Sequence, residues 1–273
     1  MILMDYAALI LGLKRYGSTE RDICVHALGV TPEQIRESVV LAPSWTPDMM
    51  PAFSEAEPLT PPGRTIRVGD IPESAVTWIT SGIGAPMLLD ALLPLGLTPC
   101  RRVLFVGSVG SLDPGIGIGD LVIPEFSVCG DGASRYIASD SLSRDPFGEK
   151  VRPDARMQEV LLAETARVCE KYGVQWHVGR NFSIDTIIAQ FAHIDTITGL
   201  GCNVIEMETA AAFRAAKLMG LPLAALFGVS DNTAANKSLV SGRTAAEKEY
   251  RKYTRRELFP QIIRGVFAGL SAG

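Results

Sequence analysis

The feature that most constrains the fold of this chain is an alternation between short apolar runs rich in Val and Ile and longer segments with helical spacing. Such alternation is typical of parallel strands joined by helices. It predicts strands at residues 39–42, 65–68, 75–80, 103–106, 120–123, 175–178, 203–205 and 223–229. It predicts helices at residues 85–95, 154–172, 208–219 and 244–270. We therefore expect a single α/β domain over residues 38–273, with a mixed, mostly parallel central sheet covered by helices on both faces.

Residues 1–37 precede this alternation and have a helical pattern of their own. Helical spacing at residues 5–16 and 18–28 predicts two helices. A third turn is expected at Thr31-Pro32, because threonine favours the cap and proline the first helical position. We interpret these residues as an N-terminal helical extension of the main domain.

The charge of the chain limits the partners that it can bind. Its 26 Lys and Arg residues and 30 Asp and Glu residues give a net charge near −4, without a block of like charges. This balance argues against nucleic acid and anionic membranes as partners. The apolar runs are shorter than the roughly 18 residues that would span a bilayer. We therefore expect a small-molecule partner.

The cysteines and histidines give no sign of a metal site or a disulfide framework. Five scattered cysteines without a CxxC pair fit a reducing compartment. The three histidines, His26, His177 and His193, lack the spacing of metal ligands. We expect a cytoplasmic protein with no metal and no cofactor.

Three polar segments directly follow predicted strands, where α/β sheets bind their ligands. They are GSVG at residues 107–110, EME at residues 206–208 and SD at residues 230–231. Each alone has a structural interpretation, as a tight turn, as acids at a helix start or as a helix cap. Each also has a functional one, because glycines expose N–H groups and a carboxylate can accept hydrogen bonds from a vicinal diol. Together the three segments favour one binding site.

The motifs SGIGAP at 81–86, VGSVG at 106–110, GDLVI at 119–123, IEME at 205–208 and VSD at 229–231 occur in this order. Their order and spacing resemble the nucleoside phosphorylase and nucleosidase superfamily. The closest branch contains the bacterial purine nucleoside phosphorylases, uridine phosphorylases and methylthioadenosine nucleosidases. The resemblance covers about residues 38–268 and implies cleavage of the bond between a base and a ribose.

The resemblance also implies roles for individual residues. Asp231 matches the acid at the departing base, oriented by Ser230, and Glu208 matches the acceptor of the ribose diol. Met207 matches an apolar wall against the sugar. Two aliphatic residues, Ile187 and Ile188, stand where an aromatic usually stacks on the base. The other residues that are expected to bind substrate are Glu206, Ser108, Val109, Gly110 and Gly82.

Two departures from the family pattern concern the nucleophile. Asp48 and Phe105 stand where phosphorylases carry two phosphate-binding arginines. Nucleosidases of the family activate water with a carboxylate close to the position of Asp48, so we expect hydrolysis of a purine-type nucleoside, with water as the nucleophile. The first alternative is phosphorolysis, with a non-standard phosphate site supplied by Arg64, Arg67, Arg180 or a neighbouring subunit. The second is a non-catalytic nucleoside-binding protein.

Two further expectations concern arginines and assembly. Arg243 lies near where some phosphorylases carry an arginine that pairs with the acid, although an exposed arginine at a helix start is the simpler interpretation. The basic run at residues 251–256 is interpreted as an exposed helix face. The resemblance implies a homo-oligomer, either a dimer or a trimer of dimers.

Overall fold

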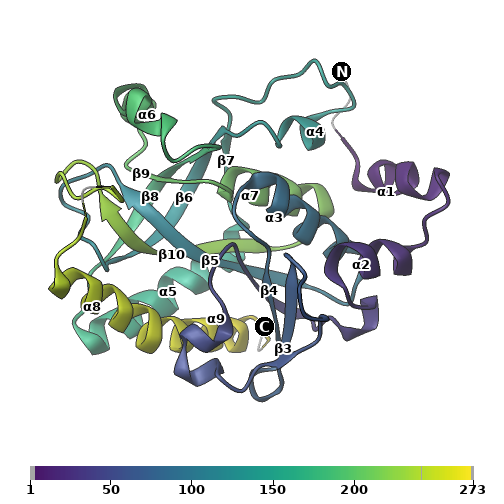
Figure 1. Ribbon diagram of the computed structural model, residues 1–273, viewed down its shortest axis with the longest axis horizontal. Coiled ribbons are helices and arrows are strands. Elements are labelled where there is room, and N and C mark those ends of the chain that lie inside the picture. Colours follow the sequence, from purple (N-terminus) through teal and green to yellow (C-terminus); the bar gives the residue numbers. More distant parts are fainter. Residues whose placement is uncertain (1–3, 241, 272–273) are drawn as a thin grey trace.

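The computed structural model describes residues 4–240 and 242–271 (Figure 1). The strands are β1 (Ser38–Ala42), β2 (Glu57–Pro58), β3 (Arg67–Ile71), β4 (Val76–Thr80), β5 (Arg102–Ser111), β6 (Leu121–Gly130), β7 (Lys150–Val151), β8 (Trp176–Ile184), β9 (Val204–Glu206) and β10 (Leu223–Asn232). They form one sheet in the order β10-β6-β8-β9-β5-β1-β4-β3-β2, with β7 beside β6. β10 also pairs with β5, so five strands close into a ring in the order β10-β6-β8-β9-β5.

The sheet is mixed, as predicted. β1 runs parallel to β4 and β5, and β5 runs parallel to β10. β8 is parallel to β6 and β9. The antiparallel pairs include β3 with β4, β6 with β7, and β5 with β9. Since parallel strands end at the same edge of a sheet, the carboxyl ends of β1, β5 and β10 lie together.

Helices cover both faces of the sheet, which confirms the expected layers. The first face carries α3 (Ala85–Leu92) and α7 (Thr209–Met219), and the other carries α5 (Ala155–Tyr172) and α9 (Phe259–Ser271) (Figure 1). Successive side chains of β5 point to opposite faces. Val103 and Phe105 therefore pack with α3 and α7, whereas Leu104 and Val106 pack with α5 and α9.

The N-terminal segment packs against the domain beside α3. It contains α1 (Tyr6–Arg15) and α2 (Glu20–Leu28), and β1 starts at Ser38 (Figure 1). The Tyr6 hydroxyl donates a hydrogen bond of 2.7 Å to the carbonyl of Leu93, and Leu28 is buried in the apolar cluster that includes α3. Residues 1–3 of the predicted extension lie outside the described residues.

Several elements differ from the predicted ones. The helix predicted at residues 244–270 consists of α8 (Ala245–Tyr253), a π-helical turn at Thr254–Leu258, and α9. Two short helices, α4 (Arg135–Ala138) and α6 (Ile194–Gly199), were not predicted. β5 and β10 are longer than predicted, because the small and polar residues at their carboxyl ends still pair with each other. Across residues 4–240 and 242–271, no helix has the length and apolar character needed to span a bilayer.

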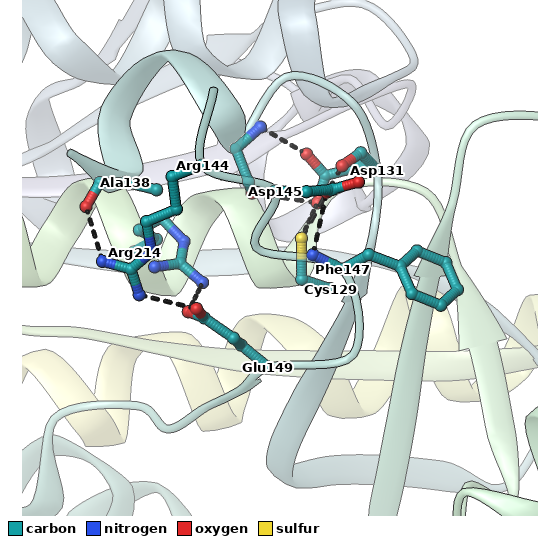
Figure 2. Close-up of polar contacts among 9 residues, drawn as sticks. Cys129, Asp131, Ala138, Arg144, Asp145, Phe147, Glu149 and Arg214 are labelled. Atoms are coloured by element: carbon teal, nitrogen blue, oxygen red, sulfur yellow. Dashed lines mark hydrogen bonds and ion pairs between the residues drawn. The ribbon is translucent and has the colours of Figure 1, made fainter. Parts of the chain in front are cut away.

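The segment between β6 and β7, residues 131–149, forms ionic contacts with α7 (Figure 2). The Glu149 carboxylate accepts hydrogen bonds from Arg144 at 2.6 Å and from Arg214 of α7 at 2.9 Å. At the start of this segment, Asp131 accepts a hydrogen bond of 3.4 Å from the thiol of Cys129. Burial and the Asp131 charge raise the pKa of Cys129 to about 12, so this thiol is not a nucleophile near neutral pH.

Candidate active site

A cavity of about 260 Å³ lies where the ends of β5, β9 and β10 meet. All three polar segments predicted from the sequence contribute to its wall, which includes Ser108, Gly110, Glu206, Met207, Glu208, Ser230 and Asp231. Two pairings bring the segments together. β10 runs beside β5 in parallel, and Ile205 of β9 lies opposite Gly110 of β5. The cavity is therefore assembled by the ring of strands.

A β-bulge in β10 lies next to the Asp231 carboxyl in this cavity. Val229 pairs with Val109 and Asp231 pairs with Gly110, so Ser230 is an extra residue between them. The Ser230 hydroxyl oxygen lies 3.1 Å from the Val109 carbonyl oxygen and 2.5 Å from Asp231 Oδ1. The hydroxyl has one proton, which Ser230 donates to Asp231 when the carboxyl is ionised. A protonated Asp231 can instead donate to Ser230, and the hydroxyl proton is then free for the Val109 carbonyl.

The environment of Asp231 favours this protonated form. The residue is only 2% exposed, and burial raises the pKa of its carboxyl. The Ser230 hydrogen bond and the charges of Arg243 and Arg251 act in the opposite direction without cancelling the effect of burial. A carboxyl whose pKa is raised above its ordinary value is suited to proton transfer.

The two glutamates of the EME motif have different partners. Glu206 accepts hydrogen bonds from Asn181 Nδ2 at 2.7 Å and Ser183 Oγ at 2.5 Å. It also accepts from the backbone N–H groups of Glu208 at 2.7 Å and Thr209 at 2.8 Å. Both of its oxygens therefore hold the first turn of α7 against β8, as the structural interpretation of this motif anticipated.

Glu208 is the glutamate that remains available to a ligand. Its carboxylate accepts a hydrogen bond of 2.6 Å from the N–H of Gly84, and the residue is 5% exposed. Burial and, secondarily, the neighbouring charge of Glu206 raise the pKa of Glu208 to about 8. Hydrogen bonds donated by the hydroxyl groups of a ligand would favour the ionised form of Glu208.

Two arginines reach the cavity from the C-terminal part of the chain. Arg251 of α8 lines the cavity and donates a hydrogen bond of 3.1 Å to Ser108 Oγ. Arg243 donates one of 2.9 Å to the backbone carbonyl of Ser230. The expected exposed face at residues 251–256 is therefore wrong for Arg251. Regular helical spacing could not place this residue, because the π-helical turn Thr254–Leu258 shifts the phase of the helix between Arg251 and the buried residues of α9.

Four of the predicted site residues are not part of the cavity wall formed by the described residues. Ile187 lines the cavity, but Ile188 is 74% exposed. The Val109 side chain is buried in the core, and only its carbonyl contacts Ser230. Gly82 donates its N–H to the Pro43 carbonyl and so joins two loops beside the cavity.

The fourth, Asp48, lies elsewhere. It is exposed on the short 3₁₀ turn Pro47–Met49 and lines a different cavity with Arg67 and Trp78. Phe105, the other basis for expecting hydrolysis, is buried against Phe227 with ring centroids 5.4 Å apart. Strand alternation points Phe105 away from the face of Ser108. Neither residue is therefore in a position to decide the nucleophile.

Comparison with known proteins agrees with this geometry. The profile of the Phosphorylase superfamily matches residues 40–263. This chain belongs to the phosphorylase superfamily. Uridine phosphorylase from Thermococcus kodakarensis is 27% identical over 182 residues, covering 61% of this chain and 61% of that protein. The chain thus spans about three fifths of the length of this curated relative of the phosphorylase superfamily.

Solved structures confirm the phosphorylase superfamily fold. Uridine phosphorylase from Vibrio fischeri superposes with a TM-score of 0.69 at 20% identity, covering 86% of this chain and 93% of the other. AMP nucleosidase from Bacteroides thetaiotaomicron superposes with a TM-score of 0.68 at 14% identity, covering 93% and 96%. Within the described residues, no group of three or more His, Cys, Asp or Glu side chains is placed to hold a metal ion.

Proposed function

We propose that this protein cleaves the N-glycosidic bond of a nucleoside, with Asp231 as the acid at the departing base. The observation that carries the proposal is the pairing of two buried carboxyls with raised pKa, Asp231 and Glu208, in the wall of one cavity. The names of the relatives, uridine phosphorylase and AMP nucleosidase, support the same reaction class.

The chemistry follows from the demands of the reaction. As the bond between C1′ and the base breaks, positive charge develops on the sugar and the base gains an electron pair. The protonated Asp231 carboxyl stabilises the base by donating a hydrogen bond or its proton. Glu208 accepts hydrogen bonds from the ribose hydroxyls, and its negative charge favours the cationic sugar. Met207 supplies an apolar surface beside it.

We propose a purine-type base, because a purine presents a basic ring nitrogen to Asp231 whereas uracil presents only carbonyl oxygens there. Uridine is the second candidate, supported by the names of the curated relatives. Gln190, which is buried in the cavity wall, offers an amide donor and acceptor to either base.

A panel of nucleosides tests the proposal. Adenosine, inosine, guanosine and uridine are each incubated with the protein, with and without inorganic phosphate, and free base is measured by chromatography. We expect release of a purine base. Cleavage of uridine alone would transfer the assignment to pyrimidines, and no cleavage of any nucleoside would contradict the proposed function.

We also propose a homo-oligomer. Ile83 and Tyr136 are large apolar side chains that are more than half exposed, and both line a second cavity that shares Ile83 and Met207 with the first. A partner subunit that covered this surface would also close the mouth of the site. Light scattering that shows only a monomer of about 29 kDa in an active preparation would contradict this proposal.

A further inference from the structure

The GDLVI motif at residues 119–123 has no role in the mechanism above. None of its residues is among the described residues that line the cavity, yet Asp120 is only 7% exposed. Asp120 Oδ2 accepts a hydrogen bond of 2.8 Å from the N–H of Gly117 and lies 2.8 Å from Nε2 of His177 on β8. The Asp120 N–H also donates to the Gly117 carbonyl at 3.2 Å. Residues 117–120 therefore form a tight turn, and the buried carboxyl that closes it has the partners that burial requires.

The backbone of this turn pairs with β10 immediately before the proposed acid. The Gly119 N–H donates a hydrogen bond of 3.0 Å to the Val229 carbonyl, and the Val229 N–H donates one of 2.9 Å to the Asp120 carbonyl. Val229 is followed directly by Ser230, the extra residue of the β-bulge, and then by Asp231. The turn therefore fixes the strand β10 directly before the bulge and the acid.

The helix α8 lies on the same turn. Gly119 has φ +95°, and a Cβ at this position would overlap Tyr250 Cδ1 and lie 3.1 Å from the backbone nitrogen of Arg251. Burial and, secondarily, the charge of the nearby Asp120 carboxylate raise the pKa of Tyr250. Arg251 follows Tyr250 and donates a hydrogen bond to Ser108 Oγ in the cavity wall. The position of this cation therefore depends on close contact between α8 and the turn.

We propose that Asp120 is a positioning residue of the active site, which acts with His177 through the turn at residues 117–120 on Asp231 and Arg251. This inference rests on the proposed function, because it takes Asp231 as the acid. Asp120 is not in the cavity wall formed by the described residues, so it acts by geometry alone. Its side-chain contacts fix the turn, and the turn fixes the strand and the helix that carry the acid and the cation. A displacement of about 1 Å in an active site can lower a rate by about 100-fold.

The alternative is that Asp120 and His177 only stabilise the fold. Their loss would then lower stability, while the folded protein would lose the same fraction of its cleavage rate, or none, whichever residue stands at position 231. A positioning role instead predicts that the loss matters when an acid is present at position 231 and little when it is absent. A double-mutant cycle separates the two interpretations.

The test compares His177→Ala with His177→Gln, each in the wild type and in Asp231→Asn. Glutamine can place a donor nitrogen where histidine has Nε2, whereas alanine removes it. The matched control is His26→Ala, at an exposed histidine of α2. Asp120→Asn, which keeps the volume of the side chain and one acceptor oxygen, replaces His177→Ala if that variant does not fold. Urea unfolding and circular dichroism of each variant set a temperature at which all are folded for the kinetic measurements.

Single-turnover cleavage of the substrate found in the panel is measured by rapid quench. We expect His177→Ala to lower the rate by about 10- to 100-fold in the wild-type background, with substrate affinity changed by less than about threefold. In the Asp231→Asn background the same change should alter the rate by less than about twofold. His177→Gln should recover most of the lost rate, and His26→Ala should not change it. An equal loss in both backgrounds, or a wild-type rate in folded His177→Ala, would overturn the proposal.

Hydrogen exchange measured by NMR tests the same contacts without turnover. The N–H groups of Gly119 and Val229 should exchange at least about 10-fold faster in His177→Ala than in the wild type, whereas those of α3 should not change. Unchanged exchange at Gly119 and Val229, or an equal increase in α3, would overturn the proposal. Absence of nucleoside cleavage by the wild type would contradict the proposed function, and the exchange rates would still decide whether Asp120 and His177 fix the turn.

Discussion

Glu206 and Glu208 stand two residues apart in one buried site, yet their carboxylates have different partners. Glu206 accepts four hydrogen bonds of 2.5 to 2.8 Å from β8 and the start of α7, whereas Glu208 accepts a hydrogen bond of 2.6 Å from Gly84. Glu206 is thereby committed to the start of α7. Glu208 lines the cavity and remains available to a ligand. The two carboxylates of the motif thus have different surroundings, and the proposed function assigns a role in binding to Glu208 alone.

Glu206→Ala should destabilise the fold. It removes the acceptor for the first turn of α7 and leaves Asn181 and Ser183 without their partner. We expect a loss of about 2 to 4 kcal/mol in the free energy of unfolding, measured in urea. The exposed Glu73→Ala serves as the control and should change stability by less than about 0.5 kcal/mol. Equal stabilities of the two variants would show that Glu206 has no structural role.

Glu208→Gln should change how stability depends on pH. Since burial raises the pKa of Glu208 to about 8 from an ordinary value of 4.5, the folded state retains a proton that the unfolded state loses. The wild type should therefore lose stability as pH rises from about 4.5 to 8, and this contribution should be absent in the neutral variant. The Tm of Glu208→Gln relative to wild type should be higher at pH 8 than at pH 5. A constant difference would contradict the raised pKa.

Gly110→Ala should damage activity through the position of the acid. A Cβ at residue 110 would be 3.2 Å from Asp231 Oδ2 and 3.3 Å from Ile205 Cγ2, which is tighter than ordinary contact. We expect kcat to fall by about 10- to 100-fold, because displacement of a catalytic group is costly. Gly199→Ala has open space around it and should keep full activity. Equal kcat values in the two variants would rule out this constraint.

Asp48→Asn should leave nucleoside cleavage within about twofold of wild type, because Asp48 is exposed in a separate cavity. Steady-state kinetics on the substrate found in the panel measures this. A sharp loss of kcat would mean that Asp48 activates water and would restore the hydrolytic hypothesis.

Most of the fold could be predicted because the spacing of apolar residues along the sequence indicates which side chains are buried. A short apolar run that is buried on both faces identifies β5 as a strand, and buried residues that recur every three to four positions identify α5 as a helix. The gathering of Ser108 and Asp231 was also predictable, since each lies near the carboxyl end of an apolar strand and the parallel strands β5 and β10 end at one edge of the sheet. The place of Glu208 was not predictable in this way, because its strand β9 pairs with the end of β5 in the antiparallel direction.

What the sequence could not place lies in segments without such a period. Asp48 and Ile188 belong to irregular loops, where a shift of one residue changes which side chain points inward. Arg251 was misassigned for a different reason. A run of basic residues indicated an exposed face, whereas Arg251 is half-buried and donates a hydrogen bond to Ser108 in the cavity wall.

The most direct test of the account is rapid-quench measurement of a single turnover by Asp231→Asn on the substrate found in the panel. Asp140→Asn, at an exposed position, serves as the control. The amide cannot supply a proton to the leaving base, so the rate of bond cleavage should fall by about 10²- to 10⁴-fold while substrate affinity changes little. A cleavage rate for Asp231→Asn equal to that of Asp140→Asn would contradict the central claim that this cavity cleaves a nucleoside with Asp231 as its acid.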